Sequence, residues 1–258
     1  MGGTANGRVF KKVLLISLAC GILWQCSVLA VLPPSPFMMP EKFVYDLTWT
    51  GLKAGTATLE MQDDGDKVRI LSTAQSASWV SVFYTVDDRV ESTLLKKPGD
   101  PFFQPSRYRL KIREGRHRRD KEVIFDQHAG KALYFDHLKH EKKGFEIAPP
   151  VFDPLSGFYY LRSLQLSVGR SVFITIFDSK KIWNVEVQVL RKERVSLSSG
   201  KVDTIVVKPL MKSEGIFSRQ GDMLIWLTDD GKHIPVKMQT KVAIGSVTAT
   251  LVSGLEKG

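Results

Sequence analysis

The sequence predicts a mainly β protein: a single curved antiparallel sheet, an open or half-closed barrel, with one helix packed on its concave face. From residue 43 onward, apolar and polar residues alternate with a period of two in one short run after another, which is typical of half-buried strands. Two of these runs resemble each other, because a Thr-rich alternating segment follows both Gly55 and Gly245. This echo predicts that the first and last strands have equivalent structural roles.

Residues 1–30 have the order of a secretory signal peptide. Basic residues up to Lys12 precede an apolar run, and small residues lead to a cleavage position after Ala30. The apolar run has about 12 residues, fewer than the about 20 that a membrane-spanning helix needs. We therefore expect an N-terminal signal helix and a periplasmic protein. The alternatives are an uncleaved inner-membrane anchor that runs to Leu32, and a lipoprotein acylated at Cys20, where Ser17 replaces the leucine that such a signal favours.

Composition narrows the classes of function. Both cysteines, Cys20 and Cys26, lie in the signal segment, so the exported domain would have neither a disulfide nor thiolate chemistry. The formal net charge is +10 and stays positive without the signal segment. In the cell envelope such a charge favours lipid head groups or lipopolysaccharide as partners.

Residues 31–42 contain four prolines and are expected to form a linker, and residues 43–258 are expected to form one domain. Asp229-Asp230-Gly231-Lys232 is the strongest hairpin sequence, because Asp-Gly accepts the positive φ of a tight turn. The expected strands are residues 43–50, 56–61, 68–73, 86–94, 106–113, 117–125, 131–136, 171–177, 183–194, 202–209, 223–228, 234–242 and 246–252.

One helix is expected between the seventh and eighth strands. Asp153 is a suitable N-cap, Pro154 suits the first helical position, and residues 155–166 continue until Gly169 ends the segment. Its apolar residues cover more than one stripe, so the helix should be mostly buried against the concave side of the sheet.

Residues that could carry catalysis are few. The sequence has no nucleophile elbow, phosphate-binding glycine loop or zinc-binding helix motif. The carboxylate pairs Asp87-Asp88 and Asp229-Asp230 are explained by an ion pair and a tight turn. His137 and His140 would point to opposite sides of a strand, so they suit a solvated hairpin end better than a metal site. We expect no catalytic residue, metal or cofactor.

A basic hairpin covers residues 107–121. Arg107, Arg109, Lys111 and Arg113 would share one face of a strand and apolar residues the other. The charge explains either a solvated edge protected from sheet-to-sheet pairing or a surface that binds an acidic lipid or glycan. No aromatic residue shares the basic face, so nucleic acid is not an expected partner.

Trp79 and Phe83 are four residues apart and would lie together on one helical turn. Packing into the core is the expected role of this pair. The alternatives are insertion into a lipid interface and gating of a cavity.

Several segments resemble a family of exported bacterial proteins known as domain of unknown function 3108, over about residues 43–253. The matching segments are Tyr45-Asp46-Leu47-Thr48-Trp49, Val86-Asp87-Asp88-Arg89, Asp153-Pro154-Leu155-Ser156, Ile225-Trp226-Leu227-Thr228-Asp229-Asp230 and Ile234-Pro235-Val236. The resemblance implies an envelope protein with a curved antiparallel sheet, similar in outline to half-barrel lipoprotein carriers, and it implies no activity.

The leading hypothesis is non-catalytic binding or carriage of an amphipathic ligand, a lipid or acylated glycan. Its acyl part would lie between sheet and helix near Phe158, Tyr159 and Trp226, because the mouths of such barrels commonly hold ligands. Its anionic head would lie near Arg107 and Arg109.

Two other classes of function stay open. The protein could be an envelope assembly or scaffold protein that docks onto a protein partner through the basic hairpin. The least favoured class is a hydrolase that uses Asp87 or Asp229, which would require these carboxylates to converge in a cleft.

Overall fold

The computed structural model describes residues 37–96, 102–178, 180–210, 223–242 and 245–254, all within one compact unit. The expected signal helix and both cysteines lie outside these residues. Two helices are described, α1 (Ser78–Ser81) and α2 (Pro154–Ser163), and neither is long and apolar enough to cross a bilayer. The strands are β1 (Glu41–Trp49), β2 (Leu52–Asp64), β3 (Lys67–Ser76), β4 (Asp87–Leu95), β5 (Gln104–Glu114), β6 (His117–Asp126), β7 (Lys131–Asp136), β8 (Glu141–Glu146), β9 (Ser171–Asp178), β10 (Lys181–Leu197), β11 (Gly200–Pro209), β12 (Leu224–Thr228), β13 (Pro235–Lys241) and β14 (Ser246–Ser253).

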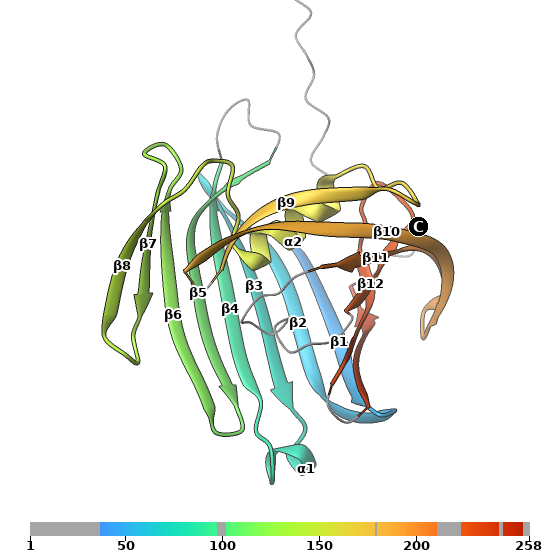
Figure 1. The fold of residues 1–258 in the computed structure, drawn as a ribbon. Helices are drawn as coiled ribbons and strands as arrows, with labels where there is room; N and C mark the ends of the chain where they lie inside the picture. The colour runs from blue at the N-terminus through green and yellow to red at the C-terminus, as the bar shows by residue number, and fades with distance from the viewer. Residues whose placement is uncertain (1–36, 97–101, 179, 211–222, 243–244, 255–258) are drawn as a thin grey trace, which may run out of the picture. The chain divides into compact units, whose positions relative to one another are not determined.

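The strands form a single curved antiparallel sheet, as predicted (Figure 1). Its order is β8-β7-β6-β5-β4-β3-β2-β1-β14-β13-β12-β11-β10-β9. The chain therefore runs from the centre of the sheet to one edge, crosses through α2 to the opposite edge, and returns strand by strand to the centre.

The two similar Thr-rich segments lie on either side of β1. Asp46 of β1 pairs with Thr56 of β2 on one side and with Thr250 of β14 on the other. A glycine is required before each segment. A Cβ on Gly55 would clash with the Gln75 carbonyl oxygen, and Gly245 has φ +78°, a left-handed conformation that favours glycine. The two similar segments are therefore the second and last strands, β2 and β14, which are the two neighbours of the central strand β1.

Side chains, and not a backbone ladder, bring the two edges of the sheet together. Phe177 of β9 makes edge-to-face contacts with Phe125 of β6 and Phe145 of β8. Lys180, after β9, forms an ion pair with Glu141 of β8 at 2.6 Å. The sheet is half-closed around an apolar core, and α2 lies on its inner side (Figure 1).

Beyond shifts of strand ends, three differences from the sequence prediction affect the architecture. β8 was not expected, because its sequence is mostly charged and exposed and only Phe145 packs against the core. Helix α2 ends at Ser163, three residues early. β1 begins at Glu41 and Phe37 is buried, so the second half of the expected linker is part of the domain.

The start of α2 is fixed by a buried capping box. The backbone N–H groups of Leu155 and Ser156 donate to Asp153 Oδ1, both at 2.9 Å, and Ser92 Oγ of β4 donates to Oδ2 at 2.7 Å. Burial raises the pKa of Asp153, and the hydrogen bonds from Ser156 and Ser92 oppose this rise. The N-cap therefore starts the helix and also ties it to the sheet.

The end of α2 is held by a buried ion pair. Arg162 donates two hydrogen bonds to the carboxylate of Glu41 on β1, at 2.6 and 3.1 Å. Its Nε donates to the backbone oxygen of His233 at 3.1 Å, in the turn between β12 and β13. The Arg162 side chain is 0% exposed and that of Glu41 is 10% exposed. One guanidinium thus joins the helix to both halves of the sheet.

Aromatic rings enclose the same guanidinium. Its Cζ lies 4.8 Å from the ring centroid of Tyr159, 5.0 Å from that of Phe37 and 5.5 Å from that of Phe43. Burial acts to lower the pKa of Arg162, but the hydrogen bonds and charge of Glu41 outweigh it and raise that pKa. The cation therefore stays charged inside the core.

Replacing Arg162 alone should destabilise the fold strongly. Arg162→Met leaves the Glu41 carboxylate buried without its partner, so we expect the free energy of unfolding to fall by about 3–5 kcal/mol in urea titrations. The double variant Glu41→Met with Arg162→Met should lose less than the single variant, because no buried charge remains. As a control, Arg194→Met breaks an ion pair with Asp203 in which both side chains are exposed, and it should leave the free energy of unfolding nearly unchanged. A double variant no more stable than Arg162→Met would contradict this account.

Candidate functional site

The predicted site residues lie in separate parts of the sheet. Arg107 and Arg109 are on the outer face of β5, because their neighbour Tyr108 is buried in the core. Arg107 Nε pairs with Glu122 of β6 at 2.5 Å, and Arg109 pairs with Asp120 and, at 3.7 Å, with Glu122. Burial acts to raise the pKa of Glu122, but the hydrogen bond and charge of Arg107 outweigh it and lower that pKa. These arginines therefore neutralise acids of the neighbouring strand.

Trp226 lies on the face of the sheet away from α2. Its neighbour Ile225 points toward the helix, and successive side chains of a strand point to opposite faces. The Trp226 ring is buried, with Lys237 Nζ 4.4 Å from its centroid. The placement of Trp226 between sheet and helix was wrong, because the register of β12 was not readable from its uniformly apolar sequence.

Tyr159 belongs to the structural cluster around Arg162. Its ring is fully buried against the guanidinium and lies 5.5 Å from the ring of Phe37. Burial raises the pKa of the Tyr159 hydroxyl well above its usual value, and the charge of Glu41 adds to this rise. Tyr159 therefore packs the helix against the sheet and does not face a cavity.

Phe158 is the predicted residue that lines a cavity. One wall of this cavity, here called the α2 pocket, is the helix, and the opposite wall is formed by β9, β10, the end of β11 and β12. Its volume is about 60 Å³. The lining residues are Pro154, Gly157, Phe158, Leu161, Ile174, Ile176, Val185, Val187, Pro209, Met223 and Ile225. Every side chain in this lining is apolar, so the pocket suits an apolar group better than a charged one.

The sequence indicated that the strand residues of the α2 pocket are buried, but not that they face a cavity. Ile174 and Ile176 alternate with half-buried or exposed residues in β9, and Val185 and Val187 do the same in β10. This period-two pattern predicts an inward face. Which inward faces meet the helix depends on where α2 crosses the sheet.

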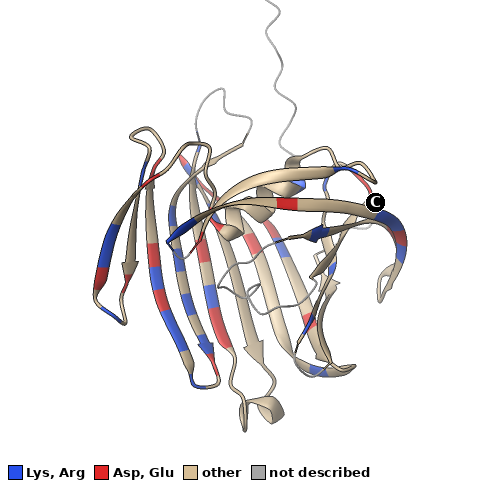
Figure 2. Cartoon of the chain, viewed as in Figure 1, with Lys and Arg blue, Asp and Glu red and all other residues tan. Residues whose placement is uncertain are grey.

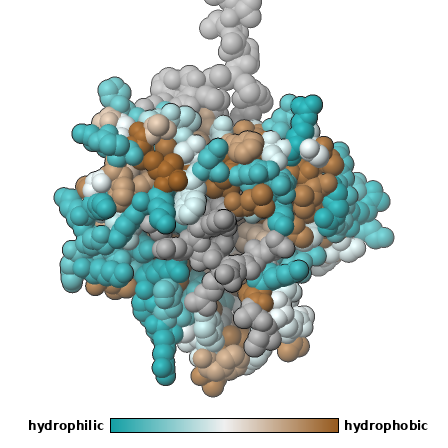
Figure 3. All heavy atoms as spheres, in the orientation of Figure 1, coloured by the Kyte–Doolittle hydropathy of each residue, from teal (hydrophilic) through white to brown (hydrophobic). Residues whose placement is uncertain are grey.

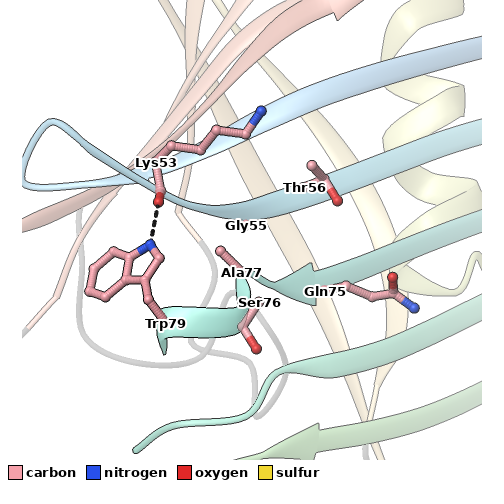
Figure 4. A pocket seen from close by; sticks show the side chains of 7 residues that line it. All are labelled: Lys53, Gly55, Thr56, Gln75, Ser76, Ala77 and Trp79. Carbon is pink, nitrogen blue, oxygen red and sulfur yellow. Dashed lines mark hydrogen bonds between the residues drawn. The ribbon is translucent and has the colours of Figure 1, made fainter. Parts of the chain in front are cut away.

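A second, open groove lies beside α1, with a volume of about 320 Å³ (Figure 4). It is lined by Lys53, Gly55, Thr56, Gln75, Ser76, Ala77 and Trp79. The indole of Trp79 forms one side, and its Nε1 donates a hydrogen bond to the Lys53 backbone oxygen at 3.0 Å. The groove thus combines one aromatic face with polar side chains.

The carboxylates considered for hydrolysis have structural partners. Asp229 forms an ion pair with Lys192 at 2.7 Å, and Asp230 accepts hydrogen bonds from the backbone N–H groups of Lys232 and His233. Asp87 is exposed at the start of β4, in the other half of the sheet. Within the part of the chain that the structure describes, no group of three His, Cys, Asp or Glu side chains could hold a metal ion.

Asp88 is the acid with an unusual environment. It is almost fully buried, and its Oδ1 accepts a hydrogen bond from the backbone N–H of Arg113 at 2.9 Å. Burial raises the pKa of Asp88 to about 7, against the effect of this hydrogen bond, and the charges of Glu114 and Asp87 add to the rise. Asp88 therefore links the start of β4 to the end of β5 as a group that titrates near neutral pH.

Comparisons with known proteins give a family and a fold. The family described as protein of unknown function (DUF3108) matches residues 44–252. Among solved structures, the chain is similar to the crystal structure of a beta-barrel-like protein of the domain of unknown function DUF1849 from Brucella abortus. The TM-score is 0.50 at 13% sequence identity, and the similarity covers 83% of this chain and 95% of that chain. At this identity the likeness concerns the fold alone. The comparison with curated proteins gives no match.

Asp88→Asn should change how stability depends on pH. The unfolded chain releases the Asp88 proton near pH 3.8, whereas the folded chain keeps it to about pH 7. Asp88 therefore makes the free energy of unfolding fall as pH rises through this window. Asp88→Asn keeps the hydrogen-bond acceptor for Arg113 and should remove this fall. Relative to the unmodified protein, the variant should gain stability at pH 8 and change little at pH 4 in urea titrations. The control Asp64→Asn, at an exposed position at the end of β2, should not show this difference. Equal effects of Asp88→Asn at both pH values would contradict the assignment.

Proposed function

The chain belongs to the DUF3108 family, and we propose that its β domain is a non-catalytic binding domain for an amphipathic envelope ligand, a lipid or an acylated glycan. The observation that carries this proposal is the α2 pocket, whose lining side chains are all apolar and which is bounded on one side by Phe158 and the other α2 residues. The signal-like order of residues 1–30 supports an exported protein that meets such ligands in the periplasm.

The apolar end of an acyl chain is the part of such a ligand that suits the α2 pocket. Transfer of methylene groups from water to an apolar lining is favourable by about 0.8 kcal/mol for each group. The volume of about 60 Å³ accepts the end of a chain and not a whole lipid. The rest of the ligand would therefore remain outside the α2 pocket.

The polar head needs a different position from the one expected from sequence. Arg107 and Arg109 are on the outer face of the sheet and are paired with Asp120 and Glu122, whereas the α2 pocket is on the inner face. We therefore assign the head group to solvent at the mouth of the α2 pocket, without a contact to these arginines.

Docking onto a protein partner in the envelope through residues 107–121 is the alternative function. The middle of this hairpin offers little free charge, because Arg107 and Arg109 are in ion pairs. Its end, beyond Arg113, keeps a concentrated positive charge. Crosslinking in cells that gives one discrete protein adduct through residues 107–121 would favour this alternative.

Filling the α2 pocket should weaken ligand retention. Ile225→Phe places a larger ring in the pocket and displaces about two methylene groups of ligand, so retained lipid should fall about tenfold. The measurement is mass spectrometry of lipids that remain with the full-length protein after gentle extraction from its native envelope. The folding of the Ile225→Phe variant is checked by circular dichroism, because overpacking lowers the free energy of unfolding by about 1–3 kcal/mol.

Two controls separate pocket filling from general effects. Ile182→Phe makes the same substitution at an exposed position of β10 and should retain lipid normally. Arg107→Gln with Arg109→Gln should also retain it, because these side chains do not face the α2 pocket. Unmodified protein without any lipid, or Ile225→Phe with the normal amount, would contradict the proposed function.

A further inference from the structure

We propose that one end of the sheet is a docking surface for an anionic phospholipid bilayer. It combines two features, here called the aromatic knob and the basic tip. The aromatic knob is the segment between β3 and β4 that carries Trp79, Val82, Phe83 and Tyr84. The basic tip is the turn between β5 and β6, which contains Arg116, together with the flanking residues Arg113 and Arg118. This surface is separate from the α2 pocket and does not depend on the function proposed for that pocket.

The aromatic knob places large apolar side chains in water. Val82 is 86% exposed and Phe83 is 62% exposed, and Trp79 and Tyr84 are also exposed. The rings of Trp79 and Phe83 lie together, with centroids 6.0 Å apart. The expectation that this pair packs into the core was therefore wrong: α1 buries Val80 and turns the aromatic side chains outward. Hydrophobic atoms are visible at this end of the molecule in Figure 3.

The aromatic knob is built by specific hydrogen bonds and so presents these side chains in a defined arrangement. Ser76 and Ser81 share a hydrogen bond between their hydroxyls at 2.7 Å, and the backbone N–H of Val86 donates to Ser76 Oγ at 2.9 Å. The indole N–H of Trp79 donates to the Lys53 backbone oxygen. Exposed apolar groups on a structured segment indicate a contact surface more strongly than the same groups on an unstructured one.

The basic tip brings arginines together, whereas two arginines in the middle of the same hairpin are paired with acids. Arg113 and Arg118 lie directly opposite each other on β5 and β6, an arrangement that is unfavourable for like charges in an isolated sheet. Arg116 is exposed in the turn between them. In the middle of the same hairpin, Arg107 and Arg109 face acids instead. Figure 2 shows the Lys and Arg residues that continue along β5 and β6.

The aromatic knob and the basic tip are in contact. The backbone N–H of Gly115 in the tip donates to the Thr85 backbone oxygen at 2.7 Å. The Tyr84 ring covers Gly115 so closely that a Cβ there would lie 2.8 Å from Tyr84 Cε2. Arg118 Nη1 donates to the Gly115 carbonyl oxygen at 2.7 Å. A guanidinium, a tyrosine ring and the apolar side chains of the knob therefore form one continuous surface.

A bilayer surface fits this combination better than a groove-binding ligand or a protein. The aromatic knob protrudes, so it can enter a soft apolar layer, and Trp and Tyr are the side chains favoured at the level of lipid head groups. The arginines beside it match the negative charge of anionic lipids. Three acids are near the basic tip. Asp88 is buried, Glu114 is half-buried and interacts with Asp88, and Asp87 is exposed. The groove behind Trp79, with Thr56 and Gln75 in its lining (Figure 4), offers hydrogen bonds to head groups.

Cosedimentation of the full-length protein with vesicles tests this surface. The protein should bind vesicles that contain phosphatidylglycerol about tenfold more tightly than vesicles of phosphatidylcholine alone, because each cation near an anionic surface contributes several-fold in affinity. Val82→Ser with Phe83→Ser, and separately Arg116→Glu with Arg118→Glu, should each weaken binding to the anionic vesicles about tenfold or more.

Matched variants elsewhere on the sheet serve as controls. Phe173→Ser with Ile182→Ser removes two exposed apolar side chains from β9 and β10, and Lys139→Glu with Lys142→Glu reverses two exposed cations near β8. Neither pair should change binding by more than about twofold, which is less than the effect of one cation at the membrane surface. Every variant carries the same residues 1–36, so any contribution of that segment to binding is common to all of them.

Depth-dependent quenching gives a readout confined to the aromatic knob. Lipids brominated on their acyl chains should quench part of the tryptophan fluorescence of the bound protein, and Trp79→Phe should remove that quenched part. The proposal would be overturned if the unmodified protein did not bind anionic vesicles. It would also be overturned if the knob and tip variants bound as tightly as the unmodified protein with unchanged Trp79 quenching. A loss of binding in the control variants equal to that in the knob and tip variants would overturn it as well.

Discussion

The ion pair between Arg162 and Glu41 is the contact through which the two halves of the sheet and the helix are held in one arrangement. The Arg162 guanidinium is fully buried. It donates hydrogen bonds to the Glu41 carboxylate on the central strand and to the backbone oxygen of His233 in the turn between β12 and β13. A buried charge is tolerated only when nearly all its hydrogen bonds are made. Any other position of α2 would leave Glu41 or Arg162 without a partner, so the pair selects the native crossing of the helix.

The position of α2 in turn decides what the inner face of the sheet can hold. The sheet closes through side-chain contacts of Phe177 with Phe125 and Phe145, so its interior is packed rather than hollow. The helix lies within this interior, fixed at one end by Asp153 and at the other by Arg162. Among the residues that the structure describes, the α2 pocket lies between Phe158 and the strands opposite, and its volume suits a small apolar group.

On the outer face, the arrangement of charged side chains along the strands decides which parts can bind a partner. Pairing across strands neutralises Arg107 and Arg109 in the middle of the β5–β6 hairpin. At its tip, Arg113 faces Arg118 and no such neutralisation occurs. The same tip contacts the protruding aromatic side chains around Phe83. Apolar and cationic groups thus gather at one end of the sheet, where neither group contributes to the core.

The amino-acid sequence by itself determined most of the strands, their turns and the helix start at Asp153, because these follow from local periodicity and turn chemistry. It showed that the two Thr-rich segments are alike, but not that both pair with β1. It did not reveal β8, whose charged sequence becomes a strand only beside β7. It placed Phe158 at a cavity but grouped it with Arg107, Arg109 and Trp226, which the tertiary structure puts on the other face. A lone arginine in a helix with apolar residues on several sides was a signal for a buried ion pair, yet its partner, Glu41, lies 121 residues away. Which faces meet across a curved sheet depends on contacts between distant segments, and only the tertiary structure decided them.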